Sequence, residues 1–263
     1  MPDIGRKFRK GLLIFFAAMI AGIFIQFSVD KRPVSEQDFI FKPSPPPFLK
    51  DSSAWSDSVY LSLSARERIS QLFMVAAYPR RGAADINRVT ELIQKYRVGG
   101  IIFFQGTPEQ IAELTKYYQS ISQVPLLFAI DGEWGLSMRF ENTIQYPRQM
   151  MLGAINDDDA IYRMGRDIGK QMKMLGLHIN FAPVVDVNNN PANPVINSRS
   201  FGEIRENVAR KGLLYMKGMQ DEGILAVAKH FPGHGDTDSD SHYELPVIKY
   251  SYERLDSIEL FPF

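Results

Sequence analysis

Residues 223–242 read Gly-Ile-Leu-Ala-Val-Ala-Lys-His-Phe-Pro-Gly-His-Gly-Asp-Thr-Asp-Ser-Asp-Ser-His. The first six are apolar or glycine, and a short apolar run of this kind is typical of a buried strand. The following fourteen hold three of the four histidines of the chain, with three aspartates and one lysine. A polar loop at the carboxyl end of a buried strand is where α/β proteins place their chemistry. The stretch therefore predicts both a strand and a functional loop.

The same alternation of apolar runs and helical patterns extends toward the N-terminus. Five strands and the helices between them predict a parallel sheet with helices outside it. The expected strands are 72–76, 98–104, 125–130, 177–182 and 223–228, and the expected helices are 66–71, 83–96, 108–120, 157–175, 203–222 and 252–260.

The position of the polar residues distinguishes a closed barrel from an open, doubly wound sheet. Asp131, Asp186 and Lys229 follow three different strands, and chemistry spread over many strand ends is typical of a barrel. The segment after the first strand, 78–84, lacks the glycine-rich phosphate turn of a doubly wound nucleotide-binding fold. A complete barrel needs eight strands in about 250 residues. The sequence therefore predicts an α/β fold, a (β/α)8 TIM-type barrel that is incomplete, with about five of the eight β-α units.

The N-terminus carries a targeting pattern. Four basic residues within 6–10 precede an uncharged stretch, 11–27, which is typical of a signal peptide or an uncleaved signal anchor. We expect residues 1–28 to direct export to the periplasmic or extracellular face, with a membrane anchor at 11–27 if the segment is not cleaved. Residues 29–55 then read as a Pro/Ser-rich linker and 56–263 as the barrel domain.

The composition limits the class of protein. Apolar residues make up 45% of the 263 residues, enough for a sizeable core, and Lys+Arg and Asp+Glu balance at 30 each. This balance argues against a nucleic-acid partner. The chain has no cysteine, which excludes disulfides, thiolate metal sites and a cysteine nucleophile. No cofactor is expected.

The loop itself contains the first two candidate groups. In an extended loop Asp240 and His242 point the same way, and a carboxylate beside an imidazole makes a proton donor and acceptor usable near neutral pH. A surface pair in a flexible loop is the alternative. Lys229 ends a buried strand and needs a polar cavity or an ion-pair partner. His230 is its neighbour, and both can enter one cavity only if the strand is kinked or bulged.

Two further candidates lie earlier in the chain. Asp131 and Arg139 flank a glycine-containing loop with Trp134, a set that suits carbohydrate, although Asp-Gly alone is a turn signal. Arg199 lies in a polar loop, where it either binds substrate oxygens or holds the loop. A metal site is disfavoured, because the proline and glycines between the candidate ligands exclude a helix that would place them on one face. Those candidate ligands are His230, His234, Asp236 and His242.

Taken in order, these segments resemble glycoside hydrolase family 3, in its β-N-acetylglucosaminidase branch. The resemblance runs from about Leu63 to the last residue, and the block 229–242 is its most specific part. The other matching blocks are 99–105, 129–135, 180–187 and 197–202.

The resemblance implies an exo-acting, retaining glycosidase that removes terminal β-linked N-acetylhexosamine from peptidoglycan fragments or chitooligosaccharides. Carried over, His242 is the acid/base and Asp240 orients it. Five positions fall on residues that hold the sugar, namely Asp131, Arg139, Arg199, Lys229 and His230.

The family's nucleophile is an aspartate on a later strand, beyond residue 263, and 259–263 resembles the segment just before strand six. We therefore expect the chain to be a fragment of a longer protein and inactive alone. The alternatives are a family 3 β-glucosidase and a non-catalytic, membrane-anchored sugar-binding fragment.

Overall fold

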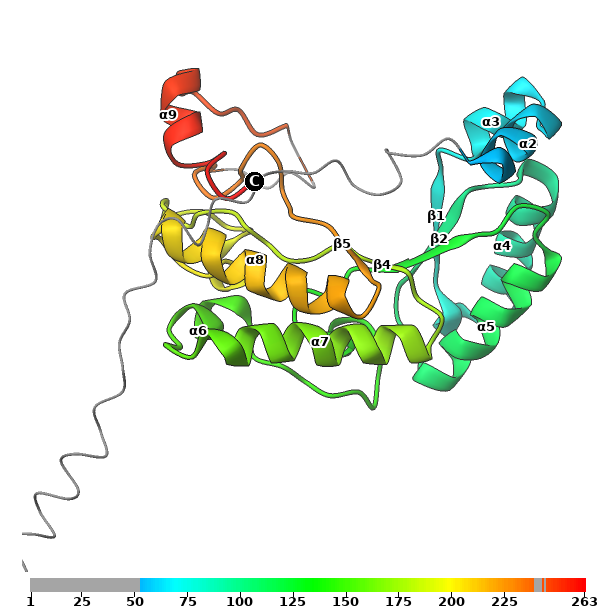
Figure 1. Ribbon diagram of the computed structural model, residues 1–263, viewed down its shortest axis with the longest axis horizontal. Coiled ribbons are helices and arrows are strands. Elements are labelled where there is room, and N and C mark those ends of the chain that lie inside the picture. The colour runs from blue at the N-terminus through cyan, green and yellow to red at the C-terminus, as the bar shows by residue number, and fades with distance from the viewer. Residues whose placement is uncertain (1–52, 239–242, 244) are drawn as a thin grey trace, which may run out of the picture. The chain divides into compact units, whose positions relative to one another are not determined.

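Five parallel strands form one sheet, and they pair in the order in which they occur in the chain, β1-β2-β3-β4-β5. The strands are β1 (Met74–Ala77), β2 (Gly100–Phe103), β3 (Leu127–Ile130), β4 (Ile179–Asn180) and β5 (Leu225–Ala226). The order never reverses, whereas a doubly wound sheet reverses at a switch point. The prediction of a parallel α/β barrel wall with five strands is confirmed (Figure 1).

The computed structural model describes residues 53–238, 243 and 245–263, and Ala54–Phe263 forms one compact unit. The expected export segment at 11–27 and the proton-transfer pair, Asp240 and His242, lie outside the described residues. Within the part of the chain that is described, no helix has the length and apolar character needed to cross a bilayer.

The helices follow the predicted pattern closely where they are long and amphipathic. They are α2 (Ala54–Ser62), α3 (Ala65–Ser70), α4 (Ala83–Tyr96), α5 (Pro108–Ile121), α6 (Gln149–Gly153), α7 (Asp158–Met174), α8 (Arg205–Asp221) and α9 (Tyr252–Ser257). The structure adds α2 and α6 to the expected elements. α2 buries none of its residues and α6 is about one turn long, so neither has an apolar stripe that reveals it.

Local signals explain where the long helices begin. Thr107 caps α5: its hydroxyl accepts from the backbone amide of Gln110, and the side-chain oxygen of Gln110 accepts from the backbone amide of Thr107. Pro108 lies in the first turn. Asp157 caps α7 by accepting from the amide of Ala160 at 3.2 Å. The expected acidic start of this helix is confirmed.

The outer layer of the barrel wall contains a close crossing of two helices. α7 and α8 pack against each other, and α8 also contacts β5 (Figure 1). A Cβ added at Gly165 would lie 2.4 Å from the carbonyl oxygen of Tyr215, and one at Gly218 would lie 2.3 Å from that of Tyr162. Only glycine therefore allows the two backbones to approach this closely.

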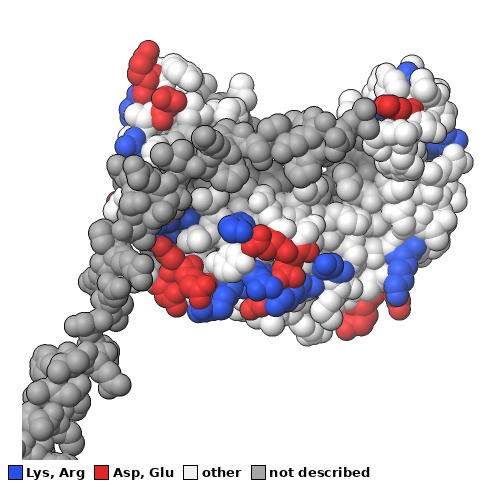
Figure 2. Space-filling model, viewed as in Figure 1, with Lys and Arg blue, Asp and Glu red and all other residues white. Residues whose placement is uncertain are grey.

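The solvent side of this helix pair is charged in both senses. Figure 2 shows acidic and basic side chains interspersed over part of this face. Exposed ion pairs such as Arg163 with Asp159 and Lys217 with Asp221 connect them. Pairs of this kind contribute little to stability, so the buried side of the helices supplies most of the packing energy.

Buried amides hold the loops that leave the strands. Asn180, at the end of β4, accepts from the amide of Gly132 at 3.0 Å and donates to its carbonyl oxygen at 3.1 Å. Gln149 binds both backbone groups of Val184 in the same way, at 2.6 and 3.1 Å. These pairs satisfy backbone groups that have no partner strand. They fix the segments that follow β3 and β4, which carry the polar site.

Candidate active site

Seven ionisable side chains meet beyond the carboxyl ends of β3, β4 and β5. We call them the strand-end network. Its members are Asp131, Glu133, Arg139, Asp186, Arg199, Lys229 and His230. They come from the loops after three strands and from the short helical turn η5 (Asn197–Arg199). Because parallel strands end at one edge of the sheet, residues distant in the sequence converge there.

Asp131 lies between two cations. Its Oδ1 accepts from Lys229 Nζ and its Oδ2 from Arg139 Nη2, each at 2.5 Å. Arg139 Nε also donates to the Asp131 carbonyl oxygen at 3.1 Å. Burial raises the pKa of Asp131, but Lys229 and Arg139 outweigh it and hold this pKa below its usual value. The residue is therefore a carboxylate at neutral pH.

Glu133 is completely buried and contacts two cations, Arg199 and Lys229. Arg199 binds both of its oxygens, with Nε 2.9 Å from Oε2 and Nη2 2.6 Å from Oε1. Lys229 Nζ lies 2.8 Å from the same Oε1. Burial raises the pKa of Glu133, yet these cations lower it below its usual value overall. A bidentate guanidinium–carboxylate pair of this kind fixes the plane of Arg199.

His230 is held in one tautomer. Its Nε2 lies 3.2 Å from Arg199 Nη2, and its Nδ1 lies 2.6 Å from Asp186 Oδ2. A guanidinium can only donate, so Nε2 accepts and the ring proton resides on Nδ1, where it is donated to Asp186. His230 is therefore a neutral imidazole in this arrangement. Asp186 has no exposed surface and also accepts from the backbone amides of His230 and His234.

The first part of the loop after β5 is tightly packed. His234 is buried, and its Nδ1 lies 2.5 Å from the hydroxyl of Thr237. Asn193 donates to the carbonyl oxygens of both residues, at 2.7 and 2.9 Å. The His234 side chain thus takes part in loop packing. In the described part of the chain, no group of three or more His, Asp or Glu side chains has a metal-holding arrangement.

The C-terminal segment braces the same loop. Glu259 is buried, accepts from Asn189 at 3.0 Å and pairs with Arg254 at 2.6 Å. A Cβ at Gly233 would lie 2.6 Å from the Cβ of Glu259, so the loop and the segment are in direct contact. Arg254 also approaches Asp236 at 3.5 Å. The brace therefore links 189, 233–236 and 254–259.

The structure brings together all five residues that the sequence predicts for sugar binding. Asp131, Arg139, Arg199, Lys229 and His230 share one network. The ion-pair alternative for Lys229 is also realised, because its ammonium contacts two carboxylates. Both Lys229 and His230 enter the network, and the peptide bond between them is cis. The positions of Asp240 and His242 lie outside the described residues.

Sequence reasoning did not select Glu133 or give Asp186 a role. A signal for Glu133 was present, since it lies two residues after Asp131 in a polar turn at a strand end. The ring of Trp134, part of the set that suits carbohydrate, is partly covered, because the guanidinium of Arg148 lies 4.7 Å from its ring centroid. That face of the indole is a cation–π contact.

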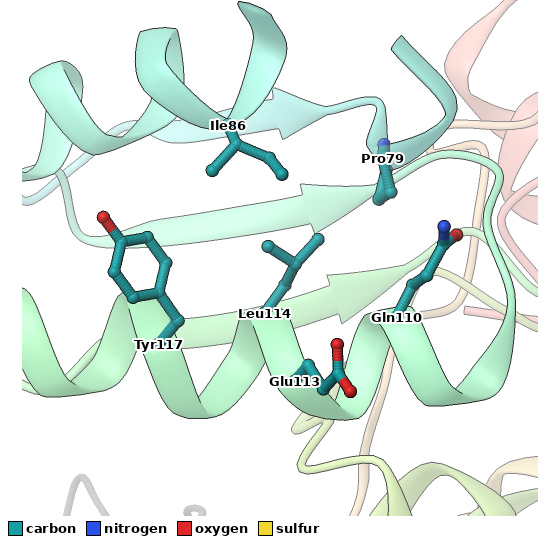
Figure 3. A pocket seen from close by; sticks show the side chains of 6 residues that line it. All are labelled: Pro79, Ile86, Gln110, Glu113, Leu114 and Tyr117. Carbon is teal, nitrogen blue, oxygen red and sulfur yellow. The ribbon is translucent and has the colours of Figure 1, made fainter. Parts of the chain in front are cut away.

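A pocket elsewhere on the domain lies apart from the network. It lies between α4 and α5 and contains none of the network side chains (Figure 3). Ile86 and Leu114 give it an apolar wall, and Gln110 and Glu113 lie at its side.

An all-parallel wall with sequential strands and its ionisable side chains gathered at the carboxyl edge defines a (β/α)-barrel domain. The sequence model described as the glycosyl hydrolase family 3 N terminal domain matches residues 64–263. The chain belongs to this family, and the resemblance seen in its motifs is confirmed.

Known proteins similar to the chain share this family character. "Beta-hexosaminidase A" of Pseudoalteromonas piscicida is 40% identical over 188 residues, 66% of this chain and 31% of that protein. A "Beta-N-acetylglucosaminidase/beta-glucosidase" of Cellulomonas fimi is 32% identical over 206 residues, 78% of this chain and 36% of that protein. The chain therefore spans about a third of the length of these relatives.

A solved structure shows the same fold. The family 3 β-N-acetylglucosaminidase of Paenibacillus sp. str. FPU-7 has 42% sequence identity and a TM-score of 0.70. The match covers 76% of this chain and 39% of that one. The domain thus corresponds to part of a family 3 barrel.

Proposed function

We propose that the protein containing this chain is an exo-acting, retaining β-N-acetylglucosaminidase. The observation that carries the proposal is the convergence of the five predicted sugar-binding residues into one network at the strand ends. The names of the similar proteins, a β-hexosaminidase and a β-N-acetylglucosaminidase, support the hexosamine as the sugar. Fragments of peptidoglycan or chitin are the proposed sources of that sugar.

The network offers both kinds of hydrogen-bonding group to a sugar. Arg139, Arg199 and Lys229 present N–H donors, while Asp131 presents carboxylate oxygens. With its proton on Nδ1, His230 has Nε2 as a hydrogen-bond acceptor, which in this structure faces Arg199 Nη2 at 3.2 Å. Sugar hydroxyls both donate and accept, so this mixture suits a ring with several hydroxyl groups. Arg199 and Lys229 are held by Glu133 before any ligand arrives, which lowers the ordering cost of binding.

For the chemical step we propose His242 as the acid/base and Asp240 as its partner. In a retaining reaction, a carboxylate attacks the anomeric carbon while the acid protonates the departing oxygen. Water then attacks the glycosyl-enzyme as the same group removes its proton. The nucleophile is proposed to lie beyond residue 263, so these 263 residues alone are expected to bind sugar without turnover.

Activity assays on the complete protein test the substrate. Cleavage of p-nitrophenyl N-acetyl-β-D-glucosaminide should exceed that of the corresponding β-glucoside. The double name of the Cellulomonas fimi relative keeps β-glucosidase as the second candidate, and the reverse order of rates would favour it. Sugar binding without product release would instead support a non-catalytic sugar-binding module.

The acid role has its own test. His242→Ala should slow the cleavage of substrates with poor leaving groups far more than that of activated phenyl glycosides, which need little protonation. Equal losses on both substrates would contradict the role. The inferred export is tested separately, by fractionating cells that express the complete protein and sequencing its mature N-terminus.

A further inference from the structure

The strand-end network has an outer layer and a buried layer. The side chains of its outer members are 14–33% exposed, and they comprise Asp131, Arg139, Arg199, Lys229 and His230. The side chains of Glu133 and Asp186 are 0% exposed. A ligand that enters the site therefore contacts the outer layer. The two buried carboxylates contact the outer side chains and not the ligand.

The two layers carry opposite charge. The outer layer holds three cations and one carboxylate, with His230 neutral, so it alone carries two excess positive charges. Glu133 and Asp186 supply two negative charges, and the seven described side chains sum to zero. Glu133 lies next to this excess positive charge, since its carboxylate is 2.6 Å from Arg199 and 2.8 Å from Lys229. In a partly buried site, charges at such distances are weakly screened.

We propose that Glu133 is a positioning residue that determines the charge preference of the site. It aligns Arg199 and Lys229 as hydrogen-bond donors and cancels one of their charges, so that an uncharged sugar ring is preferred over the same ring carrying a carboxylate. This inference rests on the proposed sugar-binding function. Glu133 acts through its two partners, because its buried oxygens are engaged by Arg199 and Lys229.

The test compares two ligands that differ in one group. Calorimetry on the complete protein gives Kd for N-acetylglucosamine and for 2-acetamido-2-deoxyglucuronate, its C6 carboxylate analogue. The wild type should bind the neutral sugar more tightly. Glu133→Gln leaves one positive charge uncancelled, so the ratio of the two Kd values should shift by about tenfold toward the carboxylate.

Two variants separate charge from structure. Glu133→Asp keeps the charge, and its Kd ratio should stay near that of the wild type. Asp85→Asn removes a buried carboxylate outside the network, one that pairs with Arg88 at 2.7 Å, and its ratio should not change. An unchanged ratio in Glu133→Gln, or an equal shift in Asp85→Asn, would overturn the proposal.

The remaining outcomes are also decisive. If Glu133→Gln does not fold, the two Kd values of the wild type provide the test. Equal or tighter binding of the carboxylate analogue by the wild type would refute the inference. Wild-type protein that binds N-acetylglucosamine but releases no product would contradict the hydrolase while leaving the charge preference standing. If the wild type bound neither sugar, both the proposed function and the proposed charge preference would be contradicted.

Discussion

The α7–α8 helix pair and the strand-end network are both closely packed, but they depend on different properties of the sequence. The helix pair approaches closely because Gly165 and Gly218 lack side chains, and its opposite face is solvated. In the network each cation pairs with a carboxylate, and Asp186 is held by hydrogen bonds from His230 and from two backbone amides. Packing of the first kind contributes to the free energy of unfolding. Pairing of the second kind is costly to bury and positions groups for a ligand.

The largest expected effect breaks the network without disturbing the helices. Lys229→Met removes a donor and leaves Asp131 and Glu133 each with one cation fewer. Removing one partner of a buried charge pair costs about 2–5 kcal/mol, so kcat/KM of the complete protein should fall about 10³-fold. Lys217→Met, at an exposed lysine of α8, is the matched control. A steady-state kcat/KM of Lys229→Met within tenfold of the wild-type value would show that Lys229 is only structural.

The two regions also differ in how far the sequence predicts them. The bounds of α4 agree with the expected range, and those of α7 and α8 differ by one or two residues, because amphipathic periodicity and caps are local signals. The strands β4 and β5 are shorter than expected, with two residues each. The apolar runs extend past the paired residues there, and the ladder is interrupted before the isolated parallel bridge between Val184 and Lys229.

The candidate site was predictable only in its outer layer. Motif resemblance selected the five outer residues. Glu133 and Asp186 escaped because their partners lie far along the chain, 66 positions for Arg199 and 44 for His230. The place of Glu133 two residues after Asp131 is a local signal of a polar turn, but it does not indicate burial beneath a cation, because the topology of the sheet decides that.

The next effect belongs to the helix pair. Gly218→Ala places a Cβ 2.3 Å from the carbonyl oxygen of Tyr162, so the helices must separate. The free energy of unfolding should fall by about 3 kcal/mol, while KM of the folded protein stays near that of the wild type. Urea denaturation measures the first quantity. Gln220→Ala, on the exposed side of the same helix, should change it by less than about 0.5 kcal/mol. Equal stability of the two variants would show that the crossing is not tight.

A smaller effect is the pH dependence of stability, which should come from the strand-end network and not from exposed carboxylates. The pKa of Asp131 and that of Glu133 are both lowered in the folded protein. Their contribution to stability is therefore complete above the unfolded pKa values, about 4, and is lost as pH falls through the lower folded values. Urea denaturation from pH 6 to 3 should show a steep loss. Asp131→Asn should make that loss shallower, whereas the exposed Asp57→Asn should not.

The smallest effect tests whether a local signal acts independently of the network. Asp157→Ala removes the side chain that caps α7 through the amide of Ala160 at 3.2 Å. Loss of an N-cap costs about 1 kcal/mol, which should appear in the urea midpoint and leave kcat/KM unchanged. Asp157→Asn should retain most of the stability, because an amide oxygen also accepts from the backbone. If Asp157→Ala instead lowered kcat/KM as Lys229→Met does, the helix layer and the network would be coupled, and their separation into a packing region and a charge region would be wrong.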